Sequence, residues 1–316
     1  MRPALNPNNR LFELARQGRQ SSALVAIGVT FLTLVVAIVG GQMLARFAIE
    51  FVLPSAGSVV NPLIDGARDL LTFTTGFVPV YLCLWAWVRL WSKRSFTTLG
   101  FEPRHPFARA VGGATVAVVM MSAVAVGLAL LPDTALAPGQ LRAVGLAALG
   151  GGLLTLLGTV VQSSGEEVLF RGWLLPTIGA RYGPWIGVAV SSLLFGLAHA
   201  LNPNATALGL LNLSLFGTFL ALYALAEGGL WGACAWHTLW NWTDNVLFGL
   251  RDSGGPLRPA LLVSITPTGR DILTGGTFGP DGSVIETAVL LIGISVIVWR
   301  IRAPHKQNGE VGVPSR

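Results

Sequence analysis

Long apolar runs alternate with short polar segments along most of the chain. Eight of these runs approach the length of about 20 residues that a helix needs to cross a bilayer. They begin near Ala23, Thr72, Phe107, Gly151, Pro184, Ala207, Gly228 and Ile285. The pattern therefore predicts an all-α fold, a polytopic transmembrane helix bundle of about eight spans.

The polar segments leave no room for a separate soluble domain. We expect a cytoplasmic N-terminal segment over 1–22, a single transmembrane domain over 23–302 and a cytoplasmic tail over 303–316. The longest connection, 251–284, contains the turn-forming sequences "SGGP", "TPTG" and "GPDGS". This predicts an external loop that is irregular or holds a short hairpin, and its sequence suggests no chemistry.

Composition and charge fit a membrane protein. Hydrophobic residues make up 52% of the chain and charged residues 11%, whereas soluble domains carry about 25% charged residues. The net charge is +6, but Lys and Arg gather at alternate ends of the spans, as the positive-inside rule requires. Asp65 and Asp69 then fall in an external loop before the second span. This distribution predicts cytoplasmic termini and a lipid bilayer as partner, and it argues against nucleic acid.

A few ionisable residues interrupt the apolar runs, where a charged side chain is costly and its default interpretation is functional. They are Glu166, Glu167, Arg171, His199, His237 and Asp244. We place Asp244 near an aqueous end of its span and leave it out of the candidate site.

Helical spacing predicts which of these residues meet. Glu167 and Arg171 are four residues apart, in the favourable order for an ion pair. A tight turn at 179–184 folds two spans into a hairpin, and Glu166 and His199 then lie about equally far from it, at about 25 Å. Their side chains can therefore meet at one depth in the bundle.

Two further pairs share helix faces. Phe195 and His199 are four residues apart in "FGLAH", as are His237 and Asn241 in "HTLWN". A buried carboxylate that is not neutralised can take a proton from water, and a histidine can relay it. A second histidine and an asparagine can donate hydrogen bonds to the oxyanion of a tetrahedral intermediate. The set predicts hydrolysis of an amide by activated water.

Three motifs occur in order on successive apolar helices: "EEVLFR" fits EExxxR, "FGLAH" fits FxxxH and "HTLWN" fits HxxxN. In this order they resemble the CAAX-protease and bacteriocin-processing family of intramembrane proteases, which includes the Ras-converting type of CAAX prenyl endopeptidase. The resemblance covers roughly 150–250. It implies an eight-helix bundle with a cavity open toward the cytoplasm.

Carried over position by position, the resemblance assigns roles to single residues. It implies Glu166 as the base and His199 as its partner, with His237 and Asn241 stabilising the oxyanion. Glu167 and Arg171 would form a supporting ion pair and Phe195 belongs to the second motif. The implied activity is an intramembrane endopeptidase of the bacterial cell membrane that cleaves a membrane-associated peptide or protein.

Other interpretations of the same residues remain open. Glu167 and Arg171 suit a purely structural pair, and a single buried histidine can serve as an interhelical hydrogen-bonding group. Glu166, His199 and His237 are also ligand types for a catalytic Zn²⁺ with an open position. We prefer a site without metal because it uses every residue once.

Two functions of other classes compete with a protease. One is a non-catalytic membrane regulator or bacteriocin-immunity protein that keeps the protease fold. The other is a transporter that uses the carboxylate and histidines as a proton relay. A transporter predicts inverted repeats with broken helices, and the sequence shows no such symmetry.

Overall fold

The computed structural model describes residues 4–53, 61–102, 105–132 and 134–303. Helices account for 74% of the residues, which confirms a mostly helical fold. The predicted tail lies outside the described residues apart from Ala303. The elements that matter for the site are α2 (Ala23–Val36), η1 (Ala37–Gly41), α3 (Gln42–Val52), α4 (Pro62–Ala86), α5 (Pro106–Ala129), α7 (Leu146–Glu167), η4 (Val168–Leu174), α8 (Leu175–Tyr182), α9 (Pro184–Ala198), α10 (Ala207–Glu227), α11 (Trp231–Trp242), η5 (Thr243–Leu247) and α13 (Val284–Arg302).

The remaining elements are short. They are the helices α1 (Arg10–Ala15), η2 (Trp87–Trp91), η3 (Phe96–Leu99), α6 (Leu141–Val144), α12 (Asp271–Thr274) and η6 (Pro280–Gly282), and the strands β1 (Thr134–Pro138) and β2 (Val263–Pro267).

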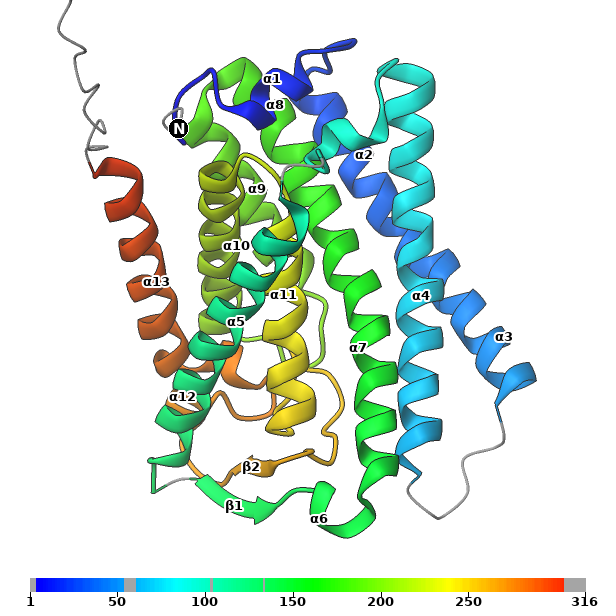
Figure 1. The fold of residues 1–316 in the computed structure, drawn as a ribbon, viewed down its shortest axis with the longest axis vertical. Coiled ribbons are helices and arrows are strands. Elements are labelled where there is room, and N and C mark those ends of the chain that lie inside the picture. Colours follow the sequence, from blue (N-terminus) through cyan, green and yellow to red (C-terminus); the bar gives the residue numbers. More distant parts are fainter. Residues whose placement is uncertain (1–3, 54–60, 103–104, 133, 304–316) are drawn as a thin grey trace, which may run out of the picture.

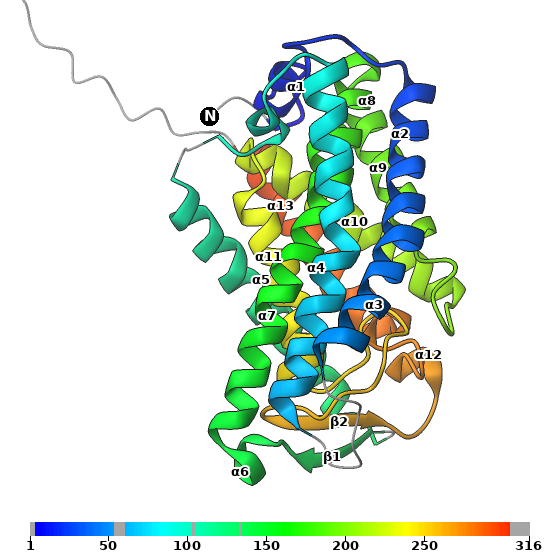
Figure 2. The same cartoon turned by 90° about the vertical axis from the view of Figure 1, so that its right-hand side faces the viewer.

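The long helices form an elongated bundle (Figures 1 and 2). At one end lie α1, α8 and the last turn of α13, and we call this the terminal end. At the opposite end, the loop end, lie α6, β1 and β2. Helix α1 and the C-terminal turn of α13 thus lie at the same end, which is consistent with an even number of crossings. Which end faces the cytoplasm stays a prediction.

Six helical segments are long and apolar enough to cross a membrane. They begin at Ala23, Pro62, Pro106, Leu146, Ala207 and Val284. The other two expected spans are shorter: α9 has 15 residues, and α11 and η5 have 12 and 5. The described residues therefore give six candidate spans of a multi-pass membrane protein, and the figure of eight stays a prediction.

The expected start of the second span, near Thr72, is wrong. Helix α4 begins at Pro62, where Asn61 caps it by accepting from the backbone N–H of Leu63. Asp65 and Asp69 therefore lie on a helix and not in a loop. A hydrophobicity argument misses this start because the first turns of α4 are polar, whereas proline at the first position and an asparagine cap both favour it.

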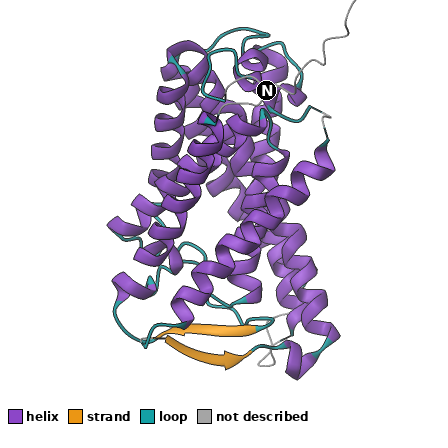
Figure 3. Ribbon diagram, turned by 60° about the vertical axis from the view of Figure 1, so that its left-hand side comes forward, coloured by secondary structure: helices purple, strands orange, loops and turns teal. Residues whose placement is uncertain are grey.

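The fold is also not purely helical. Strands β1 and β2 pair antiparallel, with Leu136 opposite Ile265 (Figure 3). The predicted loop 251–284 thus contributes a strand, but its partner comes from the connection after α5 and not from the same loop. This pairing joins two loops at the loop end. It therefore holds the segment between η5 and β2 in place.

Local signals explain where the helices around the site end. Pro176 lies in the first turn of α8, where it lacks a backbone N–H and its ring conflicts with an α-helical carbonyl at Gly172. The π-helical η4 ends just before it. Gly183, with φ of 101°, makes the turn into α9, which begins with Pro184. Gly228, with φ of 68°, ends α10 in the left-handed conformation. These turns set the relative positions of α7, α9 and α11.

Close backbone contact between glycines holds the helices that carry the site. A Cβ atom at Gly113 of α5 would lie 2.1 Å from the carbonyl oxygen of Gly232 in α11. A Cβ atom at Gly66 of α4 would lie 2.3 Å from the carbonyl oxygen of Gly151 in α7. Small residues at helix interfaces allow such close approach in membranes.

Replacing Gly113 tests this packing. We expect Gly113→Ala to destabilise the fold by about 1–3 kcal/mol, because the methyl group forces α5 away from α11. Thermal unfolding of the purified protein in detergent measures the effect. Gly112→Ala is the matched control, since a Cβ atom there meets nothing within 4 Å. Equal melting temperatures for the two variants would contradict the packing argument.

Candidate active site

A pocket of about 270 Å³ lies between α4, α7, α9, α10 and α11. Its lining contains both catalytic-type side chains and apolar ones. The lining residues are Leu34, Ile38, Phe73, Phe77, Gln162, Glu166, Phe170, Phe195, Ala198, His199, Asn202, Leu213, Phe216, His237, Trp240, Asn241, Asp252, Ser253 and Asp281. The pocket thus brings together Glu166, His199, His237 and Asn241 from three separate helical segments.

The two adjacent glutamates have different surroundings. Glu167 and Arg171 are fully buried, and Arg171 Nη1 donates to Glu167 Oε1 over 2.9 Å. Neither residue lines the pocket. Glu166 does line it, and its side chain is 12% exposed. One helix turn therefore carries a carboxylate that an arginine neutralises and a second carboxylate that faces the pocket.

His237 lies next to both glutamates. Its Nδ1 is 2.9 Å from Glu167 Oε1, and its Nε2 is 3.8 Å from Glu166 Oε2. Because a carboxylate only accepts hydrogen bonds, Nδ1 carries the proton and Nε2 faces the pocket. Sequence spacing did not predict the contact of Glu167 with His237, since the two residues are 70 positions apart.

Phe195 connects the first two motifs. Its ring lies 4.3 Å from Arg171 Cζ, a cation–π contact that covers the guanidinium face. Its backbone carbonyl accepts from Nδ1 of His199 over 2.9 Å. This bond fixes the ring of His199 at the end of α9, so that its Nε2 is free to meet a ligand. His199 makes no hydrogen bond to Glu166 in the described structure, although both line the pocket.

Gln162 is a site residue that the sequence analysis missed. Its Nε2 donates to Glu166 Oε1 over 2.6 Å, and its Oε1 accepts from Ser163 Oγ over 2.9 Å and more weakly from Asn241 Nδ2 over 3.4 Å. The sequence could have indicated it, because Gln162 is a polar residue in an apolar run, one helical turn before Glu166. Gln162 is hydrogen-bonded to Oε1 of Glu166, whereas Oε2 of Glu166 has no hydrogen-bond partner among the described residues.

The expectation that the loop 251–284 carries no chemistry is not supported by its position. Asp252, Ser253 and Asp281 line the pocket. Ser253 donates through its backbone N–H and its hydroxyl to Asp281 Oδ2, over 3.0 and 2.7 Å. These contacts bring two parts of the loop together beside the pocket. Nothing in the loop sequence indicates this, because it depends on the folding of the whole connection.

The electrostatic state of Asp252 reflects this crowded position. Desolvation by burial, and then the neighbouring carboxylate of Asp281, raise the pKa of Asp252 to about 6. His237 and His199 lower this pKa and Glu166 raises it, so the carboxyl group is coupled to the candidate site.

The polar loop residues that line the pocket show at which end of the bundle the site is bordered by loops. Asp252, Ser253 and Asp281 belong to the connection between η5 and α13, and Asn202, which also lines the pocket, belongs to that between α9 and α10. Helix α9 and η5 both run toward the loop end before these connections (Figure 1). With the predicted cytoplasmic termini, this is the non-cytoplasmic side of the bundle. The family resemblance had implied a cavity open toward the cytoplasm, and the pocket lining gives that expectation no support.

The described residues do not offer a metal site. No group of three or more His, Cys, Asp or Glu side chains among them has an arrangement that could hold a metal ion. Of the ligand set considered from sequence, His237 uses Nδ1 for Glu167 and His199 uses Nδ1 for Phe195. Both histidines keep Nε2 available, as metal-ligating histidines do, but Glu166, His199 and His237 do not form a group of this kind among the described residues.

Removal of Arg171 tests the buried ion pair. We expect Arg171→Met to destabilise the protein by about 3–5 kcal/mol, because it leaves a buried carboxylate with too little compensation. The double variant Glu167→Gln/Arg171→Met should be less destabilised than Arg171→Met alone. Thermal unfolding in detergent gives the comparison, with the exposed Arg181→Met as control. A double variant at least as unstable as the single one would contradict this description.

Asp252→Asn tests the raised pKa. A carboxyl group whose folded-state pKa is raised contributes most stability in its protonated form, and this contribution is lost as the pH rises through about 6. At pH 8 we therefore expect Asp252→Asn to be more stable than the unmodified protein, by about 1–3 kcal/mol. At pH 3.5, below the ordinary pKa of Asp, both the folded and the unfolded state carry a protonated carboxyl group, and the two melting temperatures should agree. An advantage that is the same at both pH values would contradict the assignment.

Comparison with known families adds an independent finding. Residues 148–243 match the family described as type II CAAX prenyl endopeptidase Rce1-like. The match contains all three motifs and confirms the family expected from them. No curated protein matches the chain.

Proposed function

We propose that this chain, which belongs through residues 148–243 to the CAAX-protease family, is an intramembrane endopeptidase that hydrolyses a peptide bond with glutamate-activated water. The observation that carries the proposal is the contrast between two neighbouring carboxylates. Glu167 is neutralised by Arg171, to which it is hydrogen-bonded. Glu166 has no arginine partner, and its buried Oε2 makes no hydrogen bond among the described residues and lies 3.8 Å from Nε2 of His237.

In the proposed reaction, Glu166 acts as general base. Gln162 holds Oε1, so Oε2 takes a proton from a water molecule in the pocket. The hydroxyl oxygen forms a bond to the carbonyl carbon of the substrate. The proton then passes to the leaving nitrogen as the C–N bond breaks, with no covalent intermediate on the protein.

His237 and Asn241 stabilise the oxyanion in this proposal. Nε2 of His237 donates to it when the imidazole carries two protons, since Nδ1 already donates to Glu167. With His237 in this form, its charge and that of Arg171 balance those of Glu166 and Glu167. Balanced charge is favoured in a medium of low dielectric constant. Asn241 contributes the Nδ2 donor that only weakly contacts Gln162.

His199 has a separate role in the proposed reaction. Its Nδ1 is fixed by the carbonyl of Phe195, which leaves Nε2 at the pocket. From this position it relays a proton between the glutamate and the leaving amine. This role does not require a direct hydrogen bond between His199 and Glu166, and the described structure contains none.

The proposed substrate is a membrane-associated peptide or protein of a bacterial cell, cleaved at the cytoplasmic membrane. Apolar side chains of η1 and α4, Ile38, Phe73 and Phe77, form one wall of the pocket, which suits a lipophilic peptide segment. The proposal requires no metal, because Glu166, His199 and His237 each have a role in it without one. We therefore expect the protein to keep its activity after treatment with a chelator.

Comparison of membrane proteomes tests the proposal. In cells that carry Glu166→Ala, His199→Ala or His237→Ala, we expect a precursor protein or peptide to accumulate and its cleaved product to disappear. The loss of product should exceed about 100-fold, the usual contribution of a general base. Quantitative mass spectrometry of the membrane fraction provides the measurement.

Glu50→Ala is the control, because Glu50 is exposed at the end of α3 and distant in sequence from the site. All variants should be present in the membrane at the level of the unmodified protein. If all three site variants process the same proteins as the control, the proposal is wrong and a non-catalytic regulator explains the fold better.

A further inference from the structure

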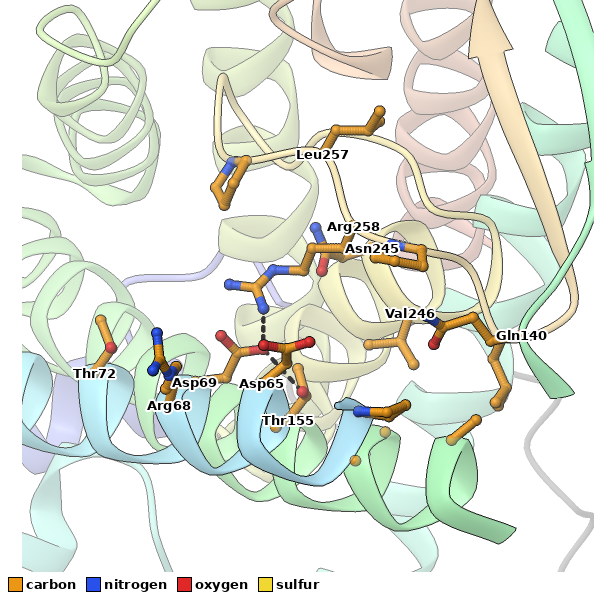
Figure 4. A pocket seen from close by; sticks show the side chains of 18 residues that line it. Asp65, Arg68, Asp69, Thr72, Gln140, Thr155, Asn245, Val246, Leu257 and Arg258 are labelled. Atoms are coloured by element: carbon orange, nitrogen blue, oxygen red, sulfur yellow. Dashed lines mark hydrogen bonds and ion pairs between the residues drawn. The ribbon is translucent and has the colours of Figure 1, made fainter. Parts of the chain in front are cut away.

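A second pocket, of about 390 Å³, lies nearer the loop end and is not part of the candidate active site (Figure 4). Polar side chains from α4, α7, η5 and two loops project into it. Its lining residues are Pro62, Asp65, Gly66, Arg68, Asp69, Thr72, Gln140, Ala148, Gly151, Gly152, Thr155, Asn245, Val246, Pro256, Leu257, Arg258, Pro259 and Leu261.

Helix α4 presents one continuous stripe to both pockets. Asp65, Asp69, Phe73 and Phe77 follow each other at intervals of four residues and therefore lie on one face. The first two line the second pocket and the last two line the catalytic pocket. The side chains on this face of α4 are charged near the second pocket and aromatic near the catalytic pocket. The two pockets therefore lie one after the other along α4.

Helix α7 and the segment formed by α11 and η5 also line both pockets, one after the other. Thr155 lines the second pocket and Glu166 the catalytic pocket, both on α7. On α11 and η5, His237, Asn241 and Asn245 are spaced by four residues, and only Asn245 belongs to the second pocket. The same three helical segments thus line both pockets in the same order from the terminal end to the loop end.

The separation of the pockets matches a short peptide. From Thr155 to Glu166 there are eleven residues, which is about 16 Å along a helix. An extended chain covers about 3.3 Å per residue. A peptide with its scissile bond at Glu166 would reach the second pocket after about five residues.

A defined ion pair keeps the second pocket in shape. Arg258 contacts Asp69 Oδ2, and Thr155 Oγ1 donates to the same oxygen over 2.9 Å (Figure 4). These three residues come from the loop after η5, from α4 and from α7. The loop is also held by backbone bonds, from Leu261 to the carbonyl of Val246 over 2.6 Å and from Gln140 to that of Ala260 over 2.7 Å. The pocket is therefore built by tertiary contacts on several sides.

Polar groups remain available inside this frame. The side chain of Gln140 makes no hydrogen bond within the described part of the chain, and the Asp65 carboxylate is exposed at the pocket. Asn245 uses its Nδ2 for the carbonyl of Leu250 and retains its Oδ1. These donors and acceptors suit a peptide backbone and hydrophilic side chains, whereas a hydrocarbon chain would leave them without partners.

We infer that the second pocket binds the hydrophilic flank of an amphipathic peptide substrate, about five residues from the cleaved bond, whose apolar part lies against Phe73 and Phe77. This inference rests on the proposed protease function and adds the substrate class. The peptide is apolar at the scissile bond and hydrophilic toward the loop end of the bundle.

Binding of defined peptides tests the inference without requiring cleavage. The full chain carrying Glu166→Gln is purified in detergent, and fluorescence anisotropy is measured with three labelled dodecapeptides of identical composition. Two of them join six apolar to six hydrophilic residues, in either order along the chain, and the third alternates the two types. We expect one of the two segmented peptides to bind at least about tenfold more tightly than the alternating one, because only it satisfies both pockets.

Variants of the second pocket give the decisive comparison. Gln140→Leu and Asp65→Asn, each added to Glu166→Gln, should weaken binding of the preferred peptide about fivefold, the equivalent of one lost hydrogen bond. Gln17→Leu is the matched control, since Gln17 is exposed after α1 at the terminal end. Unchanged melting temperatures show that the variants are folded.

The outcomes separate this inference from the proposed function. Equal binding of all three peptides, no binding of any, or pocket variants that bind like Gln17→Leu would overturn the inference, even if proteomes show that Glu166 is needed for processing. Selective binding that depends on Gln140 and Asp65 supports it, and the proteome of Glu166→Ala cells then decides separately whether the bound peptide class is cleaved.

Discussion

The structure around the site depends on the neutralisation of one buried carboxylate. Glu167 Oε1 accepts from Arg171 Nη1 and lies equally close, at 2.9 Å, to His237 Nδ1. An isolated charge at this fully buried position would be very unfavourable, so η4 and α11 are held against the end of α7. The ring of Phe195 covers Arg171 and brings α9 to the same point. One ionic centre thus fixes all three motif-bearing segments relative to each other.

This centre gives the neighbouring glutamate its distinct chemistry. Glu167 takes the hydrogen bonds of Arg171 and of Nδ1 of His237, whereas Glu166 Oε2 makes no hydrogen bond among the described residues and lies 3.8 Å from the other ring nitrogen of His237. Two adjacent residues on a helix differ in direction by about 100°, so one can face the bundle core while the other faces a pocket. The "EE" pair therefore separates a structural role from a chemical one within a single turn.

The sequence predicted the parts of this arrangement that depend on local spacing. Glu167 and Arg171 were expected to pair from their interval of four residues, and the pair is present. The contact of Glu167 with His237 and the position of Asp252 depend on how distant segments pack, which one sequence does not specify. The start of α4 at Pro62 was missed because its polar first turns resemble a loop, and β1 and β2 pair across more than a hundred residues.

The pocket beside Glu166 is apolar on one side and polar on another. A carboxylate is a useful base only if it is charged, and hydrocarbon on all sides would favour its protonated form. Apolar side chains such as Phe77 line one side of the pocket, whereas Ser253 and Asp281 border it from the loop end. In the proposed hydrolysis, the water that is consumed would reach Glu166 from this polar side of the pocket. The second pocket lies further along α4, at Asp65 and Asp69, so the polar side of the active site and the proposed site for the hydrophilic part of a substrate both lie toward the loop end.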